Sequence, residues 1–218
     1  MQLGCPVQSR CDDPRTPLQS TKRDPFMSAV RLTIFARWPE AGRAKTRLIP
    51  ALGAEGAAAL YRRLLEHTLR EARVSGLPIE LRVTGGEPAR FHDWLGGDLA
   101  VVDQGEGDLG ARMARVPAPA LLIGSDCPDC DAAMLRRAAT ALERSPAVVG
   151  PASDGGYYLL GIKRPMPFLF HEMEWSTEQV LPETLRRLAL QRIAPAMLPE
   201  LGDIDTPADL ARHPRFAP

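Results

Sequence analysis

Apolar residues along the chain follow two different periods. Short stretches rich in apolar residues predict β-strands over residues 32–36, 79–83, 100–102, 120–124, 147–150 and 158–162, and the run at 120–124 is unbroken, as in a buried parallel strand. Apolar residues at helical spacing predict α-helices over residues 54–74, 89–95, 108–116, 131–144 and 178–191, followed by a final loop. This alternation of strand and helix predicts an α/β fold of three αβα layers around a mostly parallel, Rossmann-like sheet.

Residues 1–26 differ from the rest of the chain. They contain four prolines and several charges, and they show neither the strand nor the helix period. We therefore expect a disordered N-terminal extension, followed by one domain over residues 27–218. Because Met27 directly precedes the first clean strand, we also expect it to be the natural start of the protein.

Composition and charge exclude several classes of partner. The 218 residues are 44% hydrophobic and 25% charged, and 27 basic residues balance 27 acidic ones. This balance provides no positive field for nucleic acid, and no apolar stretch approaches the roughly 20 residues of a membrane span. We expect a cytoplasmic protein that binds small molecules.

Two pairs of cysteines lie close together in the sequence, Cys5 with Cys11 and Cys127 with Cys130. The second pair has the Cys-x-x-Cys spacing of thiol–disulfide sites. A thioredoxin-like domain would be about half this size, so we favour simple packing, with Cys130 as a small apolar residue at a helix start. No second Cys or His pair supports a zinc site.

A basic loop follows the first predicted strand. Gly42, Arg43, Lys45 and Arg47 lie within six residues, between a strand and a helix. Backbone amides and cations in such a loop can bind a polyanion such as pyrophosphate, although a solvated basic loop is the alternative. The loop has neither the Walker pattern nor a Gly-x-Gly-x-x-Gly sequence, which disfavours an ordinary P-loop ATPase or a dinucleotide dehydrogenase.

Carboxylates cluster at two places far apart in the sequence. Asp126 follows the strand at 120–124, and Asp203 and Asp205 alternate near the C-terminus. Alternate residues of an extended segment share a side, so this spacing suits a divalent cation that bridges to phosphate oxygens. We interpret Asp209 as structural, because Thr206 and Asp209 form a helix-start pattern.

A third group of candidates lies in two later loops. Asp154 precedes Gly155, Gly156 and Tyr157, whose small residues and aromatic ring suit close approach to a ligand, although a plain tight turn explains them too. The stretch 175–177 (Trp175, Ser176 and Thr177) could cover an acceptor, or its hydroxyls could cap the next helix.

Six ordered motifs together resemble the DUF2064 family. They are Phe35-Ala-Arg-x-Pro-x-x-Gly-x-x-Lys-Thr-Arg-Leu48, Gly107-Asp-Leu-Gly-x-Arg-Met113, Gly124-Ser-Asp-Cys-Pro128, Gly150-Pro-x-x-Asp-Gly-Gly-Tyr-Tyr158, Trp175-Ser-Thr177 and Asp203-Ile-Asp-Thr-Pro-x-Asp-Leu210. That family is similar to the GT-A group of nucleotide-diphospho-sugar transferases, and its members are commonly labelled glycosyltransferases, some with radical-SAM gene neighbours. The resemblance implies a GT-A-type fold; donor and acceptor do not follow from fold analogy.

The resemblance also implies roles for individual residues. Nucleotide phosphates would contact Gly42, Arg43, Lys45 and Arg47, with Gln104 and Arg112 as further candidates. Asp126 and Asp154 would be catalytic, and Mg²⁺ or Mn²⁺ would bind to Asp126, Asp203 and Asp205. The acceptor would contact Gly155, Gly156, Tyr157, Trp175, Ser176 and Thr177.

The sequence departs from the family pattern in two places. Cys130 replaces a residue that is usually apolar, and residues 114–119 form a short segment broken by Pro117 and Pro119. A parallel crossover normally needs a dozen or more residues. We therefore expect the connection before the strand at 120–124 to be barely sufficient, with a looser site edge near Asp108 and Arg112.

These observations favour a metal-dependent transferase that moves a sugar from a nucleotide diphosphate sugar to a small acceptor. One alternative is a nucleotidyltransferase that releases pyrophosphate from an NTP, because residues 44–48 also resemble phospholactate guanylyltransferases. Another is a nucleotide-binding module without turnover. The sequence does not predict the oligomeric state.

Overall fold

The computed structural model describes residue 1 and residues 30–217, and most of the predicted N-terminal extension, with Met27, lies outside this range. The strands are β1 (Arg31–Arg37), β2 (Ile79–Thr84), β3 (Ala100–Asp103), β4 (Ala120–Ile123), β5 (Ala147–Pro151), β6 (Tyr157–Ile162) and β7 (Ala196–Met197). The α-helices are α1 (Ile49–Ser75), α2 (Pro88–Leu95), α3 (Leu109–Ala114), α4 (Ala132–Arg144), α5 (Val180–Leu190) and α6 (Pro207–Arg212). Short 3-10 helices cover Thr46–Leu48, Pro167–Leu169 and Pro214–Phe216.

All seven strands form one sheet in the order β3-β2-β1-β4-β6-β5-β7. Every neighbouring pair is parallel except the two pairs that involve β6. The chain runs outward from β1 through β2 to β3, then returns to place β4 on the other side of β1. The predicted α/β fold with a mostly parallel sheet is confirmed.

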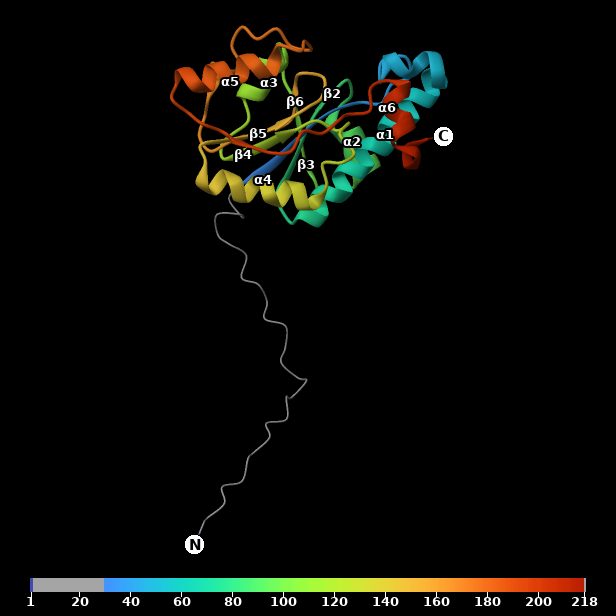
Figure 1. Ribbon diagram of the computed structural model, residues 1–218. Helices are drawn as coiled ribbons and strands as arrows, with labels where there is room; N and C mark the ends of the chain where they lie inside the picture. The colour runs from blue at the N-terminus through green and yellow to red at the C-terminus, as the bar shows by residue number, and fades with distance from the viewer. Residues whose placement is uncertain (2–29, 218) are drawn as a thin grey trace.

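Helices cover both faces of the sheet, because the central strands bury side chains in both directions. In β4, Leu121 and Ile123 pack in a core with residues of α1 and α4, whereas Ala120 and Leu122 pack in a second core with residues of α3 and α5. Alternate residues of a strand point to opposite faces. Figure 1 shows α4 on one side of the sheet and α3 and α5 on the other.

The structure corrects the expected elements at three places. Helix α1 begins at Ile49, five residues before the predicted start, and contains a kink at Gly53, whose φ is 71°. Strand β7 was not predicted, because two residues are too few for a periodic signal. The C-terminal loop contains α6, which begins where Thr206 and Asp209 predicted a helix start.

The short crossover between β3 and β4 is accommodated by close packing of α3. Only six residues are helical there, yet Met113 is buried against the sheet. A Cβ at Gly110 would lie 2.4 Å from the Phe170 carbonyl oxygen and 2.9 Å from Trp175 Nε1. Glycine at this position therefore lets α3 approach the segment around Trp175.

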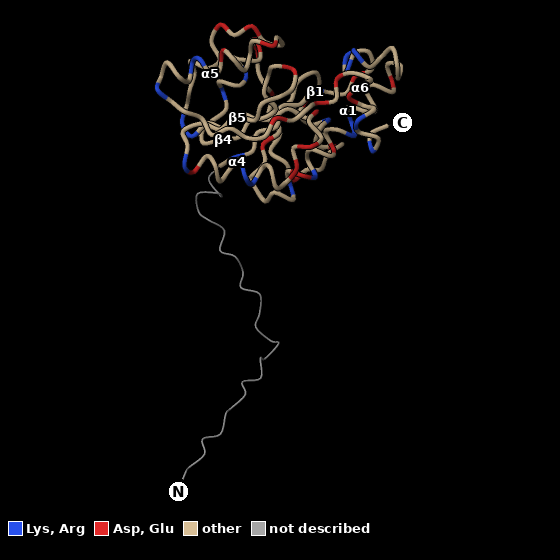
Figure 2. The backbone as a smooth tube through the Cα atoms, in the orientation of Figure 1, with Lys and Arg blue, Asp and Glu red and all other residues tan. Residues whose placement is uncertain are grey.

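None of the helices within the described residues is both long and apolar enough to cross a membrane. Figure 2 shows both basic and acidic residues spread over the visible part of the backbone, which agrees with the balanced composition.

Candidate functional site

The candidate site lies where the order of the strands reverses. Strands β1 and β4 are neighbours, and the chain continues from β1 toward one edge of the sheet, at β2, and from β4 toward the other edge, at β5. In open α/β sheets, ligands bind in the crevice outside the carboxyl ends of such strands. The loop after β1 holds Lys45 and Arg47, and the loop after β4 holds Asp126, so the sequence candidates converge there.

Lys45 connects the basic loop to the carboxylates. Its Nζ donates a hydrogen bond to Asp126 Oδ2 at 2.9 Å and lies 3.6 Å from Asp205 Oδ1. Arg47 Nη1 lies 2.5 Å from Asp205 Oδ2. The Lys45 side chain is 5% exposed, whereas that of Arg47 is 72% exposed. The phosphate and metal candidates thus form one ion-pair network that joins residues about 80 and 160 positions apart.

The charge of Lys45 is stabilised by this network. Burial alone would lower its pKa, but Asp126, by its charge and its hydrogen bond, and the charges of Asp205 and Asp203 raise it above the ordinary value of 10.5. The backbone of Lys45 is left-handed, with φ of 48°, an uncommon conformation for a residue other than glycine. The loop therefore holds a cation at a fixed place beside Asp126.

Tyr61 and Ser125 hold the loops after β1 and β4 in place, and the sequence did not indicate this role for either residue. The Tyr61 hydroxyl accepts a hydrogen bond of 3.0 Å from the Arg37 backbone N–H and shares one of 2.8 Å with Ser125 Oγ. Both side chains are buried. Tyr61 lies on the apolar face of α1, where it is indistinguishable by period from a core residue, but it fixes the loop that carries Asp126.

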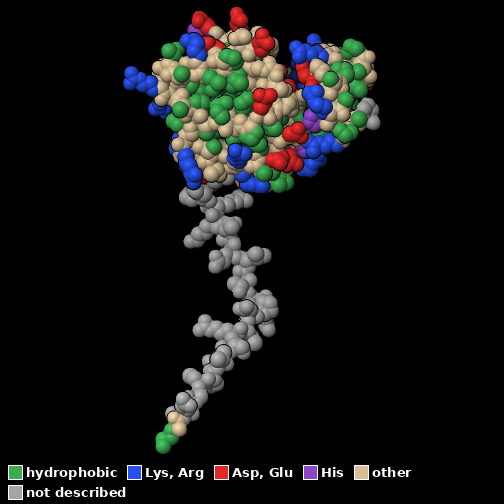
Figure 3. Space-filling model, viewed as in Figure 1, with side chains coloured by type: hydrophobic (Ala, Val, Ile, Leu, Met, Phe, Trp, Pro, Cys, Tyr) green, Lys and Arg blue, Asp and Glu red, His purple; other side chains and the backbone are tan. Residues whose placement is uncertain are grey.

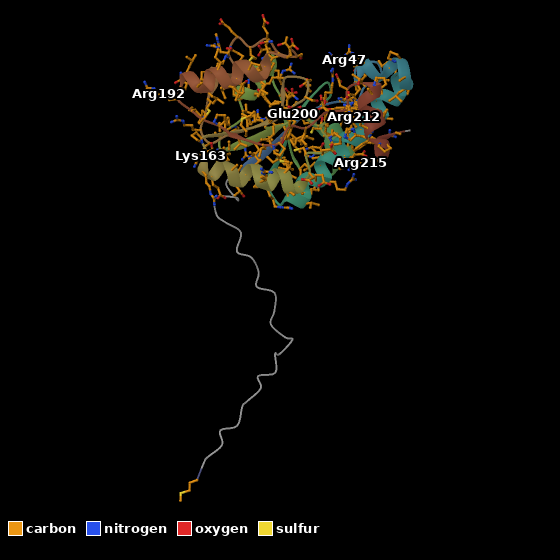
Figure 4. All side chains as sticks on the ribbon, viewed as in Figure 1. Arg47, Lys163, Arg192, Glu200, Arg212 and Arg215 are labelled. Atoms are coloured by element: carbon orange, nitrogen blue, oxygen red, sulfur yellow. The ribbon has the colours of Figure 1, made fainter. Side chains whose placement is uncertain are left out.

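A backbone hydrogen bond joins the C-terminal segment to Asp126, in the loop after β4. The Ile204 backbone N–H donates to the Asp126 carbonyl oxygen at 3.0 Å, and the Ile204 side chain is fully buried. This anchor places Asp203 and Asp205 beside Asp126. Thr206 and Asp209 form a capping box at the start of α6, which confirms the structural interpretation of Asp209. In Figure 4, Arg47 lies at the end of the molecule where Arg212 of α6 also lies.

Within residues 30–217, Asp203 has no ion-pair partner, unlike Asp126 and Asp205. Burial first, and then the nearby charges of Asp126 and Asp154, raise the pKa of Asp203 to about 6 against the opposing effect of Lys45. Asp205, in contrast, has two cationic partners in Lys45 and Arg47. Asp203 is thus the carboxylate at which a bound cation would relieve the most repulsion.

A cavity of about 280 Å³ adjoins these carboxylates. Asp126, Asp154 and Asp203 line one part of it, and Tyr157 and Trp175 are among its aromatic walls. The Tyr157 ring is largely enclosed, and burial raises the pKa of its hydroxyl. The structure therefore brings the predicted acceptor and metal candidates to one cavity.

The turn that carries Asp154 has a strict need for glycine. Gly155 has φ of 85°, and a Cβ there would lie 2.5 Å from the Glu178 Cα. Its carbonyl oxygen accepts the Leu181 N–H at 2.9 Å, which fastens the turn to the start of α5. Asp154 Oδ1 accepts the Gly156 N–H at 2.9 Å. The contacts of this turn with α5 and with its own backbone therefore fix the position of Asp154.

Ser176 and Thr177 line the cavity beside Trp175. Neither is the N-cap of α5, because Gln179 occupies that position without a side-chain cap bond. Thr177 Oγ1 donates to the Glu174 carbonyl oxygen at 2.8 Å, and Ser176 has φ of 65°. Thr177 Oγ1 also accepts the backbone N–H of Gln179 at 3.4 Å, so the capping alternative holds in part for Thr177.

Three predicted phosphate residues lie away from the carboxylates. The buried Gln104 Nε2 donates to the carbonyl oxygens of Ala36 and Arg82 at 2.9 and 3.0 Å. Arg112 Nη1 donates to Gln104 Oε1 at 3.2 Å, and Arg43 is exposed next to Glu40. Gln104 and Arg112 thus brace the carboxyl ends of β1 and β2, and neither lines the cavity.

The cysteines near Asp126 are free and buried. Burial raises the pKa of the Cys127 thiol to about 12, and it also raises the pKa of the Cys130 thiol. Both thiols therefore stay protonated near neutral pH. Both side chains pack in the core with residues of α4. This arrangement agrees with the packing interpretation; Cys5 and Cys11 lie outside the described residues.

The carboxylates fit a divalent cation that is shared with a bound phosphate. Over residues 30–217, no group of three or more His, Cys, Asp or Glu side chains is arranged to hold a metal ion. Asp126 and Asp203 nevertheless line the same cavity, and the repulsion at Asp203 favours a cation. Mg²⁺ typically binds one or two carboxylates together with substrate phosphates, so this pair suffices chemically.

Comparison with protein families identifies one model. Residues 68–177 match the family described as an uncharacterized protein conserved in bacteria, DUF2064. The chain belongs to the DUF2064 family. The match covers α2, β3, β4 and the Asp154 turn, so the family region includes Asp126 and most of the cavity lining. A comparison of this DUF2064 chain with curated proteins finds no match.

Solved structures share the fold of this DUF2064 protein. A proposed nucleotide-diphospho-sugar transferase from Desulfovibrio desulfuricans G20 is 31% identical, with a TM-score of 0.79 over 84% of this chain and 85% of its own. Rv0371c from Mycobacterium tuberculosis H37Rv is 23% identical, with a TM-score of 0.50 over 85% and 98%. The 4-diphosphocytidyl-2C-methyl-D-erythritol synthase from Anaerococcus prevotii DSM 20548 is 12% identical, with a TM-score of 0.52 over 88% and 98%. The last two likenesses concern the fold alone.

Proposed function

We propose that the protein is a divalent-metal-dependent transferase that moves a sugar from a nucleotide diphosphate sugar to a small acceptor. One observation carries this proposal: Lys45 and Arg47 meet Asp126, Asp203 and Asp205 at the strand-order reversal, directly beside a cavity. The 31% identical relative, described as a proposed nucleotide-diphospho-sugar transferase, supports the same class of donor.

In this proposal the basic loop binds the diphosphate. Lys45 and Arg47, with Arg43 and the amide near Gly42, would hold its negative charge, and Asp126 and Asp203 would hold the metal ion. The bound metal would supply charge neutralisation of the diphosphate as it departs. Asp205 orients the two cations, because it lies 3.6 Å from Lys45 Nζ and 2.5 Å from Arg47 Nη1.

The reaction forms one bond and breaks one. The acceptor nucleophile bonds to the anomeric carbon of the sugar, and the bond from that carbon to the phosphate oxygen breaks. The electron pair leaves on the nucleoside diphosphate, and the acceptor proton passes to Asp154. Asp154 suits this role because it lines the cavity and has no basic side-chain partner within residues 30–217.

A thermal-shift panel tests the donor. UDP, GDP, CDP, ADP, their sugar conjugates and the four NTPs would be compared with and without Mg²⁺ or Mn²⁺, because ligands of the folded state raise its stability. We expect metal-dependent stabilisation by one nucleoside diphosphate and its sugar conjugate. Turnover with that donor should release free nucleoside diphosphate.

Two other results would replace the proposal. Preference for one NTP, with release of pyrophosphate, would assign nucleotidyl transfer. Stabilisation by a nucleotide without any turnover would assign a binding module. Asp126→Ala separates the enzymes from the binding module. The substitution should abolish metal-dependent turnover under either enzymatic function, whereas a binding module has no turnover to lose.

A further inference from the structure

The cavity has two chemically different walls. Its apolar wall includes Phe35, Leu109, Met113, Leu122, Trp175 and Val180, several of which pack in the core on the α3 and α5 face of the sheet. Its acidic wall is formed by Asp126, Asp154 and Asp203, and its described lining includes no Lys, Arg or His. Figure 3 shows hydrophobic side chains gathered near α3 and α5, with acidic side chains beside them.

The basic residues of the site are held outside this cavity. Lys45 Nζ is occupied by Asp126 and Asp205, and Arg47 by Asp205. Arg112 donates to Gln104 Oε1 at 3.2 Å and, through Nε, to the Gly107 carbonyl oxygen at 3.0 Å. Four carboxylates at the site thus face two cations, and the excess negative charge is on the cavity side.

This distribution of charge discriminates between acceptors. A phosphorylated or carboxylated acceptor would place a second anion next to Asp154 and Asp203 without a counter-ion, and like charges at short range are unfavourable. A divalent cation between Asp126 and Asp203 would be balanced by the diphosphate of the donor, which leaves Asp154 unpaired. A hydroxyl can donate a hydrogen bond to Asp154, and an ammonium can also neutralise it.

We propose that this cavity binds an acceptor with an apolar body and a hydroxyl or amine end, and that it rejects phosphorylated and carboxylated acceptors. The apolar body lies against Phe35, Leu122 and Trp175, and the polar end faces Asp154. This inference rests on the proposed transferase function and adds the class of acceptor to it.

Matched probes test the acceptor class without knowledge of the natural substrate. Phenylethanol, phenylethylamine, phenylethyl phosphate and phenylpropionate share a ring and differ in the end group. Their binding to the full chain would be measured by titration calorimetry, with and without the nucleoside diphosphate and Mg²⁺. We expect the alcohol and the amine to bind at least about tenfold more tightly than the two anions. Equal or tighter binding of the phosphate, or no binding of any probe, would overturn the inference.

A charge placed in the cavity wall should change this preference. Leu109 is 41% exposed at the start of α3, so Leu109→Lys should fold and should reduce the discrimination against phenylethyl phosphate about three- to fivefold. The matched control is Leu190→Lys, because Leu190 is 66% exposed on α5 and does not line the cavity. Unchanged discrimination in Leu109→Lys, or the same change in both variants, would contradict the assignment of the cavity.

The two proposals fail in different ways. Release of nucleoside diphosphate from a nucleotide sugar reports the transferase function and requires none of the probes. If the donor turns over but the anionic probes bind best, the acceptor class is wrong and the transferase function stands. If the alcohol and the amine bind best but no nucleotide sugar binds or reacts, the transferase function is wrong.

Discussion

The free protein should become more stable when the charge of Asp203 is removed. Burial and the neighbouring carboxylates raise the pKa of Asp203 to about 6 in the folded protein, whereas the ordinary value is 3.8. Between these values the folded protein keeps a proton that the unfolded chain has already released. The free energy of unfolding therefore falls as the pH rises from about 4 to about 6, and the penalty persists at higher pH.

The size of the effect follows from the shift. A rise of about two units corresponds to about 3 kcal/mol as an upper value, and partial exposure of Asp203 to solvent reduces it to about 1–2 kcal/mol. Asp203→Asn is neutral in both states, so it should stabilise the metal-free protein by about 1–2 kcal/mol at pH 8. A domain of this size would gain roughly 2–8 °C in Tm.

Chemical denaturation in EDTA at pH 8 and at pH 4 measures this difference. We expect a gain at pH 8 that nearly disappears at pH 4, and a loss of stabilisation by nucleotide and Mg²⁺ in the same variant. Asp93→Asn is the control, because Asp93 is exposed on α2 outside the site, and it should change stability by less than about 0.5 kcal/mol. A destabilised Asp203→Asn, or a gain that is the same at both pH values, would refute the reasoning.

Three further substitutions test the support of the site. Lys45→Ala should weaken nucleoside diphosphate binding about 10- to 100-fold in calorimetry, because a buried cation is lost, and unchanged affinity would contradict the phosphate loop. Tyr61→Phe should cost about 1–3 kcal/mol in denaturant unfolding, because the buried Ser125 hydroxyl loses its partner; a neutral result would mean that water replaces it. Gly155→Ala should cost about 2–4 kcal/mol in the same assay, because φ is 85° and its Cβ would meet Glu178, and a smaller cost would show that the turn can relax.

Sequence patterns predicted the parts of the fold in which one period dominates. The strand before Asp126 is a continuous apolar run, and the strand before Lys45 is apolar except for Thr33, so both strands were predicted, whereas their adjacency is known only from the structure. The antiparallel pairing of β6 with β5 is a local hairpin across the Asp154 turn, but the pairing of β6 with β4 joins residues about 40 positions apart, for which a single sequence contains no local signal. The two-residue β7 is likewise fixed by contact with β5 and not by its own composition.

The site was predictable as a set of loops but not as a network. Motif position indicated Lys45, Asp126 and Asp203 separately, because each follows a turn or a strand end. Their mutual distances depend on the Ile204 N–H bond to the Asp126 carbonyl oxygen, a contact over 78 positions that no spacing rule contains. For the same reason Gln104, which looked like a ligand residue in its loop, proves to use its amide for backbone carbonyls.

The electrostatic division of the site gives a physical reason for both proposals. Lys45 and Arg47 are positioned by Asp126 and Asp205, so the free protein already holds in place the two cations that would bind the proposed diphosphate. Asp203 remains charged against its raised pKa at neutral pH, and a group kept in an unfavourable state is stabilised by the ligand that relieves it. Metal and donor binding should therefore recover the stability that the free protein loses at Asp203. In the proposed transferase the donor would give Asp154 no such compensation, and Asp154 would remain available to select and deprotonate the acceptor.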